Sequence, residues 1–257
     1  MTVRQLPLPD LVAHCVRLGI PGVGLWREPV QEYGIEAAAA LVRDAGLTVT
    51  TLCRGGFFTT DGWEAANRAA IDECVALGTD TLVLVSGGLP PGSRDLPGAR
   101  ARIAAAIGTL APYAGRRGVR LAIEPLHPMY ASDRCAISTL DQALDIAEHF
   151  PAEQVGVVVD TYHLWWDDRA PAAVARAGEG GRIHSFQLAD WATPLPAGVL
   201  DGRAQLGTGT IDLKAWAALV EKAGYAGPVE VELFNEELWG RDGVTVLEET
   251  VEAFLAV

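Results

Sequence analysis

A regular alternation of short apolar runs with longer amphipathic runs most constrains the fold of this chain. The short runs are rich in β-branched residues and predict strands, whereas the longer runs carry apolar residues at helical spacing. Eight strands are expected, each followed by a helix: Val3–Leu6, Val23–Trp26, Thr48–Cys53, Thr81–Val85, Val119–Glu124, Val155–Asp160, Ile183–Gln187 and Val229–Leu233. Units in this order predict a parallel sheet closed into a (β/α)8 TIM barrel, an α/β fold, with residues 1–257 as a single domain.

An open, doubly wound sheet is the alternative fold for such an alternation. That fold often carries a glycine-rich phosphate-binding loop after an early strand, but Arg27-Glu28-Pro29 follows the run Val23–Trp26 here. The length of 257 residues suits one barrel, because barrels of this type commonly have roughly 250 residues. The pattern therefore favours the barrel.

The net charge narrows the classes of partner, and the cysteines indicate the compartment. The formal net charge is −13 and no run rich in lysine and arginine occurs, which argues against nucleic acid and favours a small molecule or a cation. The four cysteines form no CxxC pair, which predicts reduced thiols in a cytoplasmic protein. Because no signal-like start and no run of about 18 apolar residues is present, no membrane span is expected.

Four side chains with oxygen donors lie at or near the carboxyl ends of the last four predicted strands. They are Glu124, Asp160, Gln187 and Glu232. Active sites of such barrels lie at this end of the strands, so neighbouring strands can aim these oxygens at one point. Each residue alone could cap its strand or pair with an arginine. Converging carboxylates repel one another without a cation, so three carboxylates and an amide in consecutive units predict a site for a hard divalent metal ion.

Two residues on the same strands compete with this ligand set. His184 lies three residues before Gln187, so it has the opposite strand parity and is expected to face the helices; it remains the alternative third ligand. Glu230 shares the parity of Glu232 but lies deeper, where an interior charge needs a partner.

Four further residues are candidates for contacts with a substrate. His163 follows Asp160 by three residues, so the first turn beyond the strand could bring it over the site. Arg203 lies in a long segment without helical periodicity and could grip hydroxyl, carboxylate or phosphate groups. His127 and Trp165 also follow strands that bear candidate ligands, and Trp165 could line a sugar pocket or form an oligomer contact.

Several motifs together resemble the xylose isomerase-like sugar phosphate isomerase/epimerase superfamily, which includes hydroxypyruvate isomerase, ketose 3-epimerases and inosose dehydratase. The motifs are IEPLHP, VVVDTYHLWWD, FQLAD, LDGRAQLGTGTIDL and VEVELFN. The resemblance covers nearly the whole chain and is stronger in its second half. It implies a TIM barrel with one divalent metal ion, usually manganese, magnesium or cobalt. The implied ligands are Glu124, Asp160, Gln187 and Glu232.

The resemblance also implies roles for other residues and shows where this chain departs from the pattern. His163 matches the histidine of the DxxH motif, and Arg203 matches an arginine that grips the substrate. Ketose epimerases usually have histidine at the third ligand position, so Gln187 is closer to the hydroxypyruvate isomerase branch. Ketose 3-epimerases place a second glutamate where this chain has Tyr130. With five histidines and an acidic balance, the chain is not expected to be a three-zinc DNA-repair endonuclease.

These observations predict a divalent-metal-dependent isomerase or epimerase of a sugar, sugar phosphate or small hydroxy-carbonyl compound. Glu124 and Glu232 would transfer the proton through a cis-enediolate. A lyase of the keto-inositol dehydratase type on the same site is the alternative, and a non-catalytic sugar-binding barrel is the third reading. The resemblance suggests a homodimer or homotetramer.

Overall fold

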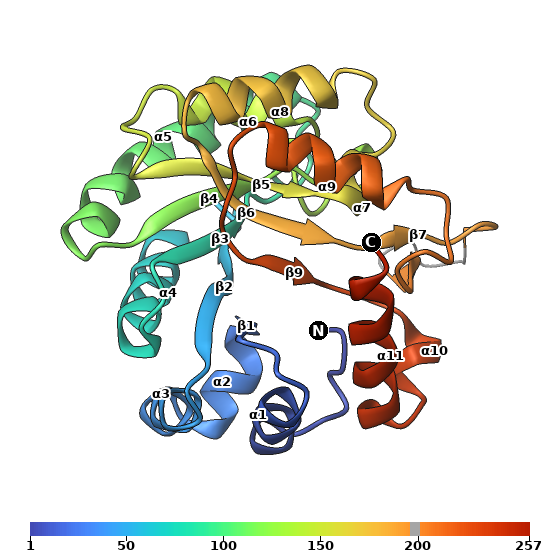
Figure 1. Ribbon diagram of the computed structural model, residues 1–257. Helices are drawn as coiled ribbons and strands as arrows, with labels where there is room; N and C mark the ends of the chain where they lie inside the picture. Colours follow the sequence, from blue (N-terminus) through green and yellow to red (C-terminus); the bar gives the residue numbers. More distant parts are fainter. Residues whose placement is uncertain (196–200) are drawn as a thin grey trace.

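The computed structural model describes residues 1–195 and 201–257, and its centre is a curved sheet of seven parallel strands (Figure 1). The strands, in their order around the sheet, are β1 (Gly22–Trp26), β2 (Thr48–Gly56), β3 (Thr81–Val85), β4 (Arg120–Glu124), β5 (Val155–Asp160), β6 (Ile183–Leu188) and β9 (Val229–Val231). Each strand pairs in parallel with the next, so the sheet forms a nearly closed barrel. The predicted TIM-barrel fold is confirmed.

Helices cover the outside of this barrel (Figure 1). The longer helices are α1 (Leu8–Arg17), α3 (Ile35–Asp44), α4 (Trp63–Leu77), α5 (Leu96–Arg116), α6 (Leu140–Ala147), α8 (Ala170–Glu179), α9 (Leu213–Lys222) and α11 (Gly243–Leu255). Polar caps fix where several begin: the Thr139 hydroxyl accepts from the Gln142 N–H, and the Asp212 carboxylate accepts from the Ala215 N–H. Over the described parts of the chain, no helix has both the length and the apolar character needed to cross a bilayer.

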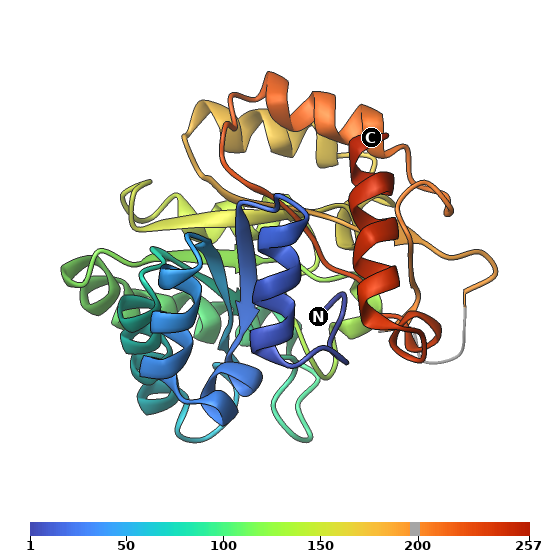
Figure 2. The ribbon, with the colours of Figure 1, turned by 60° about the horizontal axis from the view of Figure 1, so that its bottom comes forward.

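The first predicted strand, Val3–Leu6, is wrong. Residues 2–5 form a turn, and Pro7 interrupts the run directly after it. A single side chain joins this segment to the end of β9, because the Thr2 hydroxyl donates to the Val231 carbonyl (2.7 Å) and accepts from the Leu233 N–H (3.1 Å). The N-terminal segment lies with α1 on one side and α11 on the other (Figure 2). A side-chain bridge thus takes the place of a hydrogen-bonded strand between β9 and β1.

Short elements follow the carboxyl ends of the strands. The helices α2 (Arg27–Tyr33) and α7 (Thr161–Leu164) begin directly after β1 and β5, and α10 (Glu236–Trp239) lies beyond β9. Beyond β6, the strands β7 (Asp190–Trp191) and β8 (Arg203–Ala204) pair as an antiparallel ribbon. These elements surround the mouth of the barrel at which the strands end.

Two layers of core define which side chains face the barrel interior. A large cluster fills the space between the strands and the helices, and a small separate cluster joins Cys53, Val83, Ala122 and Val158. These four lie on β2 to β5, so they belong to the inward face of consecutive strands. Because side chains alternate along a strand, the residues two positions after Ala122 and Val158 also point inward. The inward face of the sheet thus leads from an apolar interior to the candidate site.

Candidate metal and substrate site

The four candidate ligands all lie at the carboxyl-terminal mouth of the barrel. Glu124 ends β4 and Asp160 ends β5, each two residues beyond an inward apolar side chain. Gln187 on β6 pairs in register with Asp160. Glu232 follows β9 directly, and its backbone N–H donates to the Leu188 carbonyl (3.1 Å). Strand register therefore brings together residues that lie up to 108 positions apart in the sequence (124 to 232).

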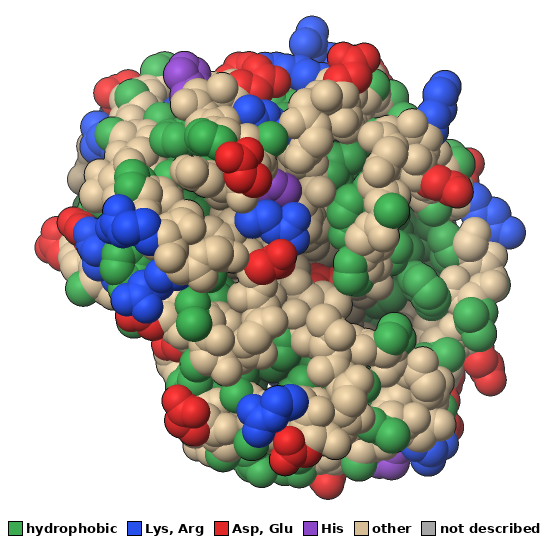
Figure 3. All heavy atoms as spheres, turned by 60° about the vertical axis from the view of Figure 1, so that its left-hand side comes forward, with side chains coloured by type: hydrophobic (Ala, Val, Ile, Leu, Met, Phe, Trp, Pro, Cys, Tyr) green, Lys and Arg blue, Asp and Glu red, His purple; other side chains and the backbone are tan. Residues whose placement is uncertain are grey.

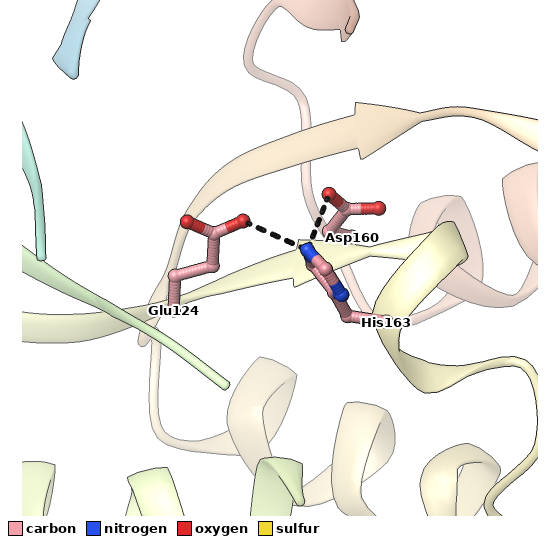
Figure 4. A group of neighbouring side chains, drawn as sticks. All are labelled: Glu124, Asp160 and His163. Carbon is pink, nitrogen blue, oxygen red and sulfur yellow. Dashed lines mark ion pairs between the residues drawn. The ribbon is translucent and has the colours of Figure 1, made fainter. Parts of the chain in front are cut away.

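Two of these carboxylates form a compact buried cluster with His163 (Figure 4). One ligand atom from each of Glu124, Asp160 and His163 lies within 4.8 Å of the others. The imidazole Nε2 is 3.9 Å from Glu124 Oε1 and 3.9 Å from Asp160 Oδ2. His163 reaches this place because α7 begins directly after β5, where Asp160 Oδ1 accepts from the Tyr162 N–H (2.8 Å). Asp160 therefore caps the helix with one oxygen and points the other at the cluster.

Both ring nitrogens of His163 lie within hydrogen-bond distance of a donor. Burial lowers the pKa of this imidazole well below its ordinary value, so the ring is neutral and carries one hydrogen. The backbone N–H of His127 lies 3.2 Å from Nδ1 and Arg203 Nη2 lies 3.1 Å from Nε2, and these two contacts require opposite tautomers. Nε2 is the ring nitrogen that faces the two carboxylates, so it is the atom that would meet a metal ion or an oxygen of a substrate.

Glu232 differs from the other two carboxylates, because donors already hold both of its oxygens. The Trp26 indole donates to Oε1 (2.9 Å), and Arg203 Nη1 donates to Oε2 (2.6 Å). Arg203 Nη1 also lies 3.5 Å from Asp160 Oδ2, and Nη2 lies 3.1 Å from the Nε2 of His163. The arginine thus reaches the cluster, where in this structure it contacts protein carboxylates, and its contact with a substrate stays a prediction.

Local structure explains how Arg203 comes to lie there. Arg203 is 2% exposed and sits on β8, paired with Trp191 of β7. The Asp190 carboxylate accepts four backbone N–H groups, from Trp191 and from three residues beyond β8, Gly207, Gly209 and Ile211. A Cβ on Gly209 would come within 2.4 Å of this carboxylate, so only glycine allows the close approach.

Trp26 is a functional candidate that the sequence analysis missed. Its indole also packs against Phe234, with ring centroids 5.4 Å apart, and lies under the Arg54 guanidinium. Trp26 is the last residue of β1, so it follows the same strand-end pattern as the carboxylates. The sequence analysis looked for oxygen ligands at the strand ends, so it passed over the indole N–H donor of Trp26.

Charge is poorly compensated in this cluster. Burial, with the charges of Asp160 and Glu232, raises the pKa of Glu124 well above its ordinary value. Burial also raises the pKa of Asp160 to about 6, although Arg203 opposes the shift. Carboxylates that resist ionisation in this way would be stabilised by additional positive charge. The electrostatics therefore suit a bound cation.

Gln187 contributes a free oxygen to the same mouth, whereas His184 does not reach it. Neither Gln187 Oε1 nor Asp160 Oδ2 has a hydrogen-bond partner within residues 1–195 and 201–257, although both atoms are buried. His184 Nε2 lies 2.8 Å from the Ala152 carbonyl, in the loop that precedes β5. A hard divalent cation prefers oxygen ligands such as carboxylates and amide carbonyls. The residues present therefore fit such an ion, and two of their buried oxygens lack any other partner within the described residues.

Aromatic side chains form one wall of the mouth. The His127 ring lies 5.2 Å from that of Trp191 and 5.6 Å from that of Trp166, and Trp165 lies 5.2 Å from Trp191. Tyr130, at the position where a glutamate was noted as missing, lies 6.0 Å from the His163 ring. His127 thus lies beside the cluster through its backbone contact with His163, whereas Trp165 packs against Trp191.

A parallel barrel with a polar cluster at its carboxyl-terminal mouth is the architecture of a TIM-barrel protein with a site at the strand ends. The model of the xylose isomerase-like TIM barrel family matches residues 12–255, and the chain belongs to this family.

Curated relatives in this family include a dehydratase and an isomerase. The 3-dehydroshikimate dehydratase of Pseudomonas aeruginosa is 34% identical over 164 residues, which are 62% of this chain and 24% of that protein. The inosose isomerase of Bacillus velezensis is 30% identical over 145 residues, which are 54% of this chain and 49% of that protein. The match thus spans about a quarter of the first relative and about half of the second.

Solved structures share the whole barrel. A crystal structure of a protein from Sinorhizobium meliloti has a TM-score of 0.95 and 41% identity, and the match covers 99% of this chain and 95% of that one. A structure of the IolI protein with a bound zinc atom has a TM-score of 0.81 and 20% identity, covering 95% of this chain and 90% of that one. At this identity the second likeness concerns the fold.

Proposed function

We propose that this chain is a divalent-metal-dependent isomerase or epimerase of a sugar or a small hydroxy-carbonyl compound. The observation that carries the proposal is the buried convergence of Glu124 and Asp160 with the orphaned oxygen of Gln187 at one mouth of the barrel. Similarity to an inosose isomerase supports the same class of reaction. Four buried, unpaired cysteines are consistent with a cytoplasmic location.

Glu124, Asp160, Gln187 and Glu232 are the residues that would hold the metal ion, with Mn²⁺, Mg²⁺ or Co²⁺ as candidates. When bound, such an ion polarises a carbonyl oxygen and acidifies the neighbouring C–H group. Because Trp26 and Arg203 donate to the two oxygens of Glu232, this carboxylate would bind the ion fully only if Arg203 gave up its contact with Oε2 and turned to the substrate.

Proton transfer falls to the two glutamates. Glu124 on β4 and Glu232 after β9 are separated in the sheet by β5 and β6, so they face a substrate from different sides. One carboxylate takes the proton from the carbon next to the carbonyl, which leaves an enediolate. The other carboxylate, in its protonated form, returns a proton to the neighbouring carbon in an isomerase or to the opposite face of the same carbon in an epimerase.

The remaining residues hold and orient the substrate. His163 Nε2 and the guanidinium of Arg203 face the cluster and would contact hydroxyl or carbonyl oxygens of the substrate. His127 and Trp165 offer ring faces that exclude water from one side of the pocket. These groups suit a small polyhydroxylated compound.

Dehydration is the second candidate, because a 3-dehydroshikimate dehydratase is 34% identical over 164 residues of this chain. The first step would be the same removal of a proton next to a carbonyl. The electron pair would then expel a hydroxide, protonated to water, instead of being reprotonated on carbon. An alkene product would identify this reaction.

A substrate panel tests the proposal. The metal-free protein and the protein loaded with Mn²⁺, Co²⁺ or Mg²⁺ would be assayed in deuterated water with ketoses, aldoses, keto-inositols, hydroxypyruvate and 3-dehydroshikimate. We expect about one divalent ion per chain, activity only in the loaded protein, and deuterium on carbon in the product.

Matched variants complete this experiment. Glu124→Gln and Glu232→Gln should each lower kcat by about 10²- to 10⁴-fold, the range for loss of an acid–base group. A protein that binds no divalent ion, or that is equally active in chelator, would overturn the metal-dependent mechanism. Turnover unchanged in both variants would remove Glu124 and Glu232 from the proton transfer. No turnover of any substrate by the loaded protein would leave a sugar-binding barrel as the better description.

A further inference from the structure

We propose that Glu230 is a positioning residue that fixes the side-chain amide of Gln187, so that the amide oxygen faces the candidate metal site. The inference rests on the proposed function, because Gln187 is a ligand only if the site binds metal. Glu230 itself lies below the cluster and serves neither as a proposed ligand nor as a proton-transfer group.

One hydrogen bond determines which end of the amide points where. Gln187 on β6 pairs in register with Glu230 on β9, and Gln187 Nε2 donates to Glu230 Oε2 (3.0 Å). Rotating the amide by half a turn would place its carbonyl oxygen against the carboxylate, which offers no N–H donor. The carboxylate therefore selects the orientation in which Gln187 Oε1 is directed away from it, and this oxygen has no hydrogen-bond partner anywhere in the described chain.

The first strands of the barrel hold the carboxylate itself. The hydroxyls of Thr50 and Thr51 on β2 both donate to Glu230 Oε1, the latter over 2.8 Å. A Cβ on Gly24 of β1 would come within 2.9 Å of the same oxygen, so the missing side chain leaves room for it. With two donors on Oε1, Glu230 presents its Oε2 as a fixed acceptor to Gln187. Groups behind a metal ligand commonly orient it in this way.

Glu230 faces the opposite end of the barrel from the candidate site. It lines a hollow of about 380 Å³ together with residues at the amino ends of the strands, among them Thr48, Arg120 and His184. The molecule is hollowed on this face, with acidic, basic and histidine side chains at the edge (Figure 3). Gln187 therefore lies between this hollow and the cluster of Glu124, Asp160 and His163. Glu230 acts on the site through Gln187.

Binding of Mn²⁺ to the metal-free protein tests the role. In Glu230→Met the side chain keeps its length but loses its acceptor, and we expect Mn²⁺ affinity by titration calorimetry to fall by about 10- to 100-fold. Glu230→Gln is the matched control, because its carbonyl can still accept from Gln187, and it should retain most of the affinity. The melting temperature of each metal-free variant separates this effect from a loss of fold.

An exchange of the two side chains gives a second, independent readout. Gln187→Glu alone puts two carboxylates in contact and should weaken Mn²⁺ binding. Gln187→Glu combined with Glu230→Gln restores one amide and one carboxylate in a hydrogen bond, so the double variant should bind Mn²⁺ more tightly than the single variant.

The outcomes distinguish the two proposals. If the unaltered protein binds no Mn²⁺, the proposed function fails. If it binds Mn²⁺ and a folded Glu230→Met variant binds equally well, the positioning role fails. Should Glu230→Met not fold, a folded double variant with no recovery over Gln187→Glu would overturn the positioning role.

Discussion

The first three strands of the barrel and the last four differ in what they bring to the carboxyl-terminal mouth. The last four, β4, β5, β6 and β9, carry Glu124, Asp160, Gln187 and, just beyond β9, Glu232. The first three carry no carboxylate at their ends; Trp26 of β1 instead donates to Glu232. Thr50 and Thr51 of β2 likewise donate to Glu230. One half of the barrel thus presents acceptors, and the other half supplies donors that fix two of them.

Ligands on one half of a barrel are not sufficient to form a metal site, because the orientation of each carboxylate must also be fixed. Each carboxylate has two oxygens, and an oxygen without a donor can rotate away or attract a proton when it is buried. Asp160 shows the effect of one donor, because the Tyr162 N–H holds Oδ1 and Oδ2 is left directed at the cluster. Glu232 is held at both oxygens, by Trp26 and by Arg203. Substitutions in either half of the barrel can therefore test this division of roles.

Asp160→Asn removes one proposed carboxylate ligand from the half of the barrel that presents acceptors. We expect the affinity for Mn²⁺ to fall by more than about 100-fold, beyond the range typical of residues behind a ligand. The metal-free fold should be retained, because burial disfavours the ionised form of this carboxyl group, as its raised pKa shows, and the amide of asparagine carries no charge. Titration calorimetry and thermal melting measure the two quantities. Unchanged affinity would remove Asp160 from the site.

The ionisation of Asp160 should also affect how the unfolding free energy of the metal-free protein depends on pH. Burial raises the pKa of Asp160 to about 6, above the value of about 3.9 expected in the unfolded chain. The folded protein therefore binds more protons, and the stability that this group provides at low pH is lost as the pH rises from about 4 to about 6.

Asp160→Asn provides the control for this measurement. The difference between the unfolding free energies of the metal-free protein and the variant should change in favour of the variant between pH 4.5 and pH 7.5. Mn²⁺ should bind more tightly at pH 7.5, because the ligands must be deprotonated. A difference that does not change with pH would contradict the raised pKa.

Trp26→Phe tests whether a donor from the first half of the barrel contributes to the site. The variant keeps an aromatic ring against Phe234 but removes the donor to Glu232 Oε1. We expect Mn²⁺ affinity or kcat to fall by about 10-fold, the lower end of the range for residues behind a ligand. Trp216→Phe on the outer helix α9 is the matched control and should change neither quantity. Equal effects of the two substitutions would show that Trp26 only packs.

His184→Gln should have the smallest effect on the site. The side chain contacts the Ala152 carbonyl, outside the mouth of the barrel, so Mn²⁺ affinity should stay within about twofold of the unaltered protein. The unfolding free energy should fall by about 1 kcal/mol through the loss of one buried hydrogen bond. A large loss of metal affinity would instead support His184 as the third ligand.

Much of the fold and part of the site could be predicted from local pattern. Seven of the eight expected strands occur, because runs such as Thr81–Val85 and Val155–Asp160 are buried on both faces and need apolar residues throughout. The first expected strand, Val3–Leu6, failed because a run this short forms a strand only if a neighbour offers a ladder, and here Thr2 bridges to β9 instead.

The partners of the site residues were beyond the reach of local pattern. Trp26 and Glu232 are 206 positions apart, and Thr50 and Glu230 are 180 apart. Arg203 was expected to face a substrate, but in the structure it lies on three residues of the site. Nothing in the spacing of these residues encodes such contacts, because they depend on how the barrel closes.

Local sequence specifies which residue types stand at the strand ends and which face of each strand they share, because side chains alternate along a strand. That information is enough to predict that Glu124, Asp160, Gln187 and Glu232 lie at one mouth of the barrel. How each of these side chains is held depends on the three-dimensional packing of the strands. Closure of the barrel puts Trp26 and Arg203 on Glu232, and Glu230 behind Gln187. Hydrogen bonds across the barrel depend on register and curvature, which no single stretch of sequence specifies.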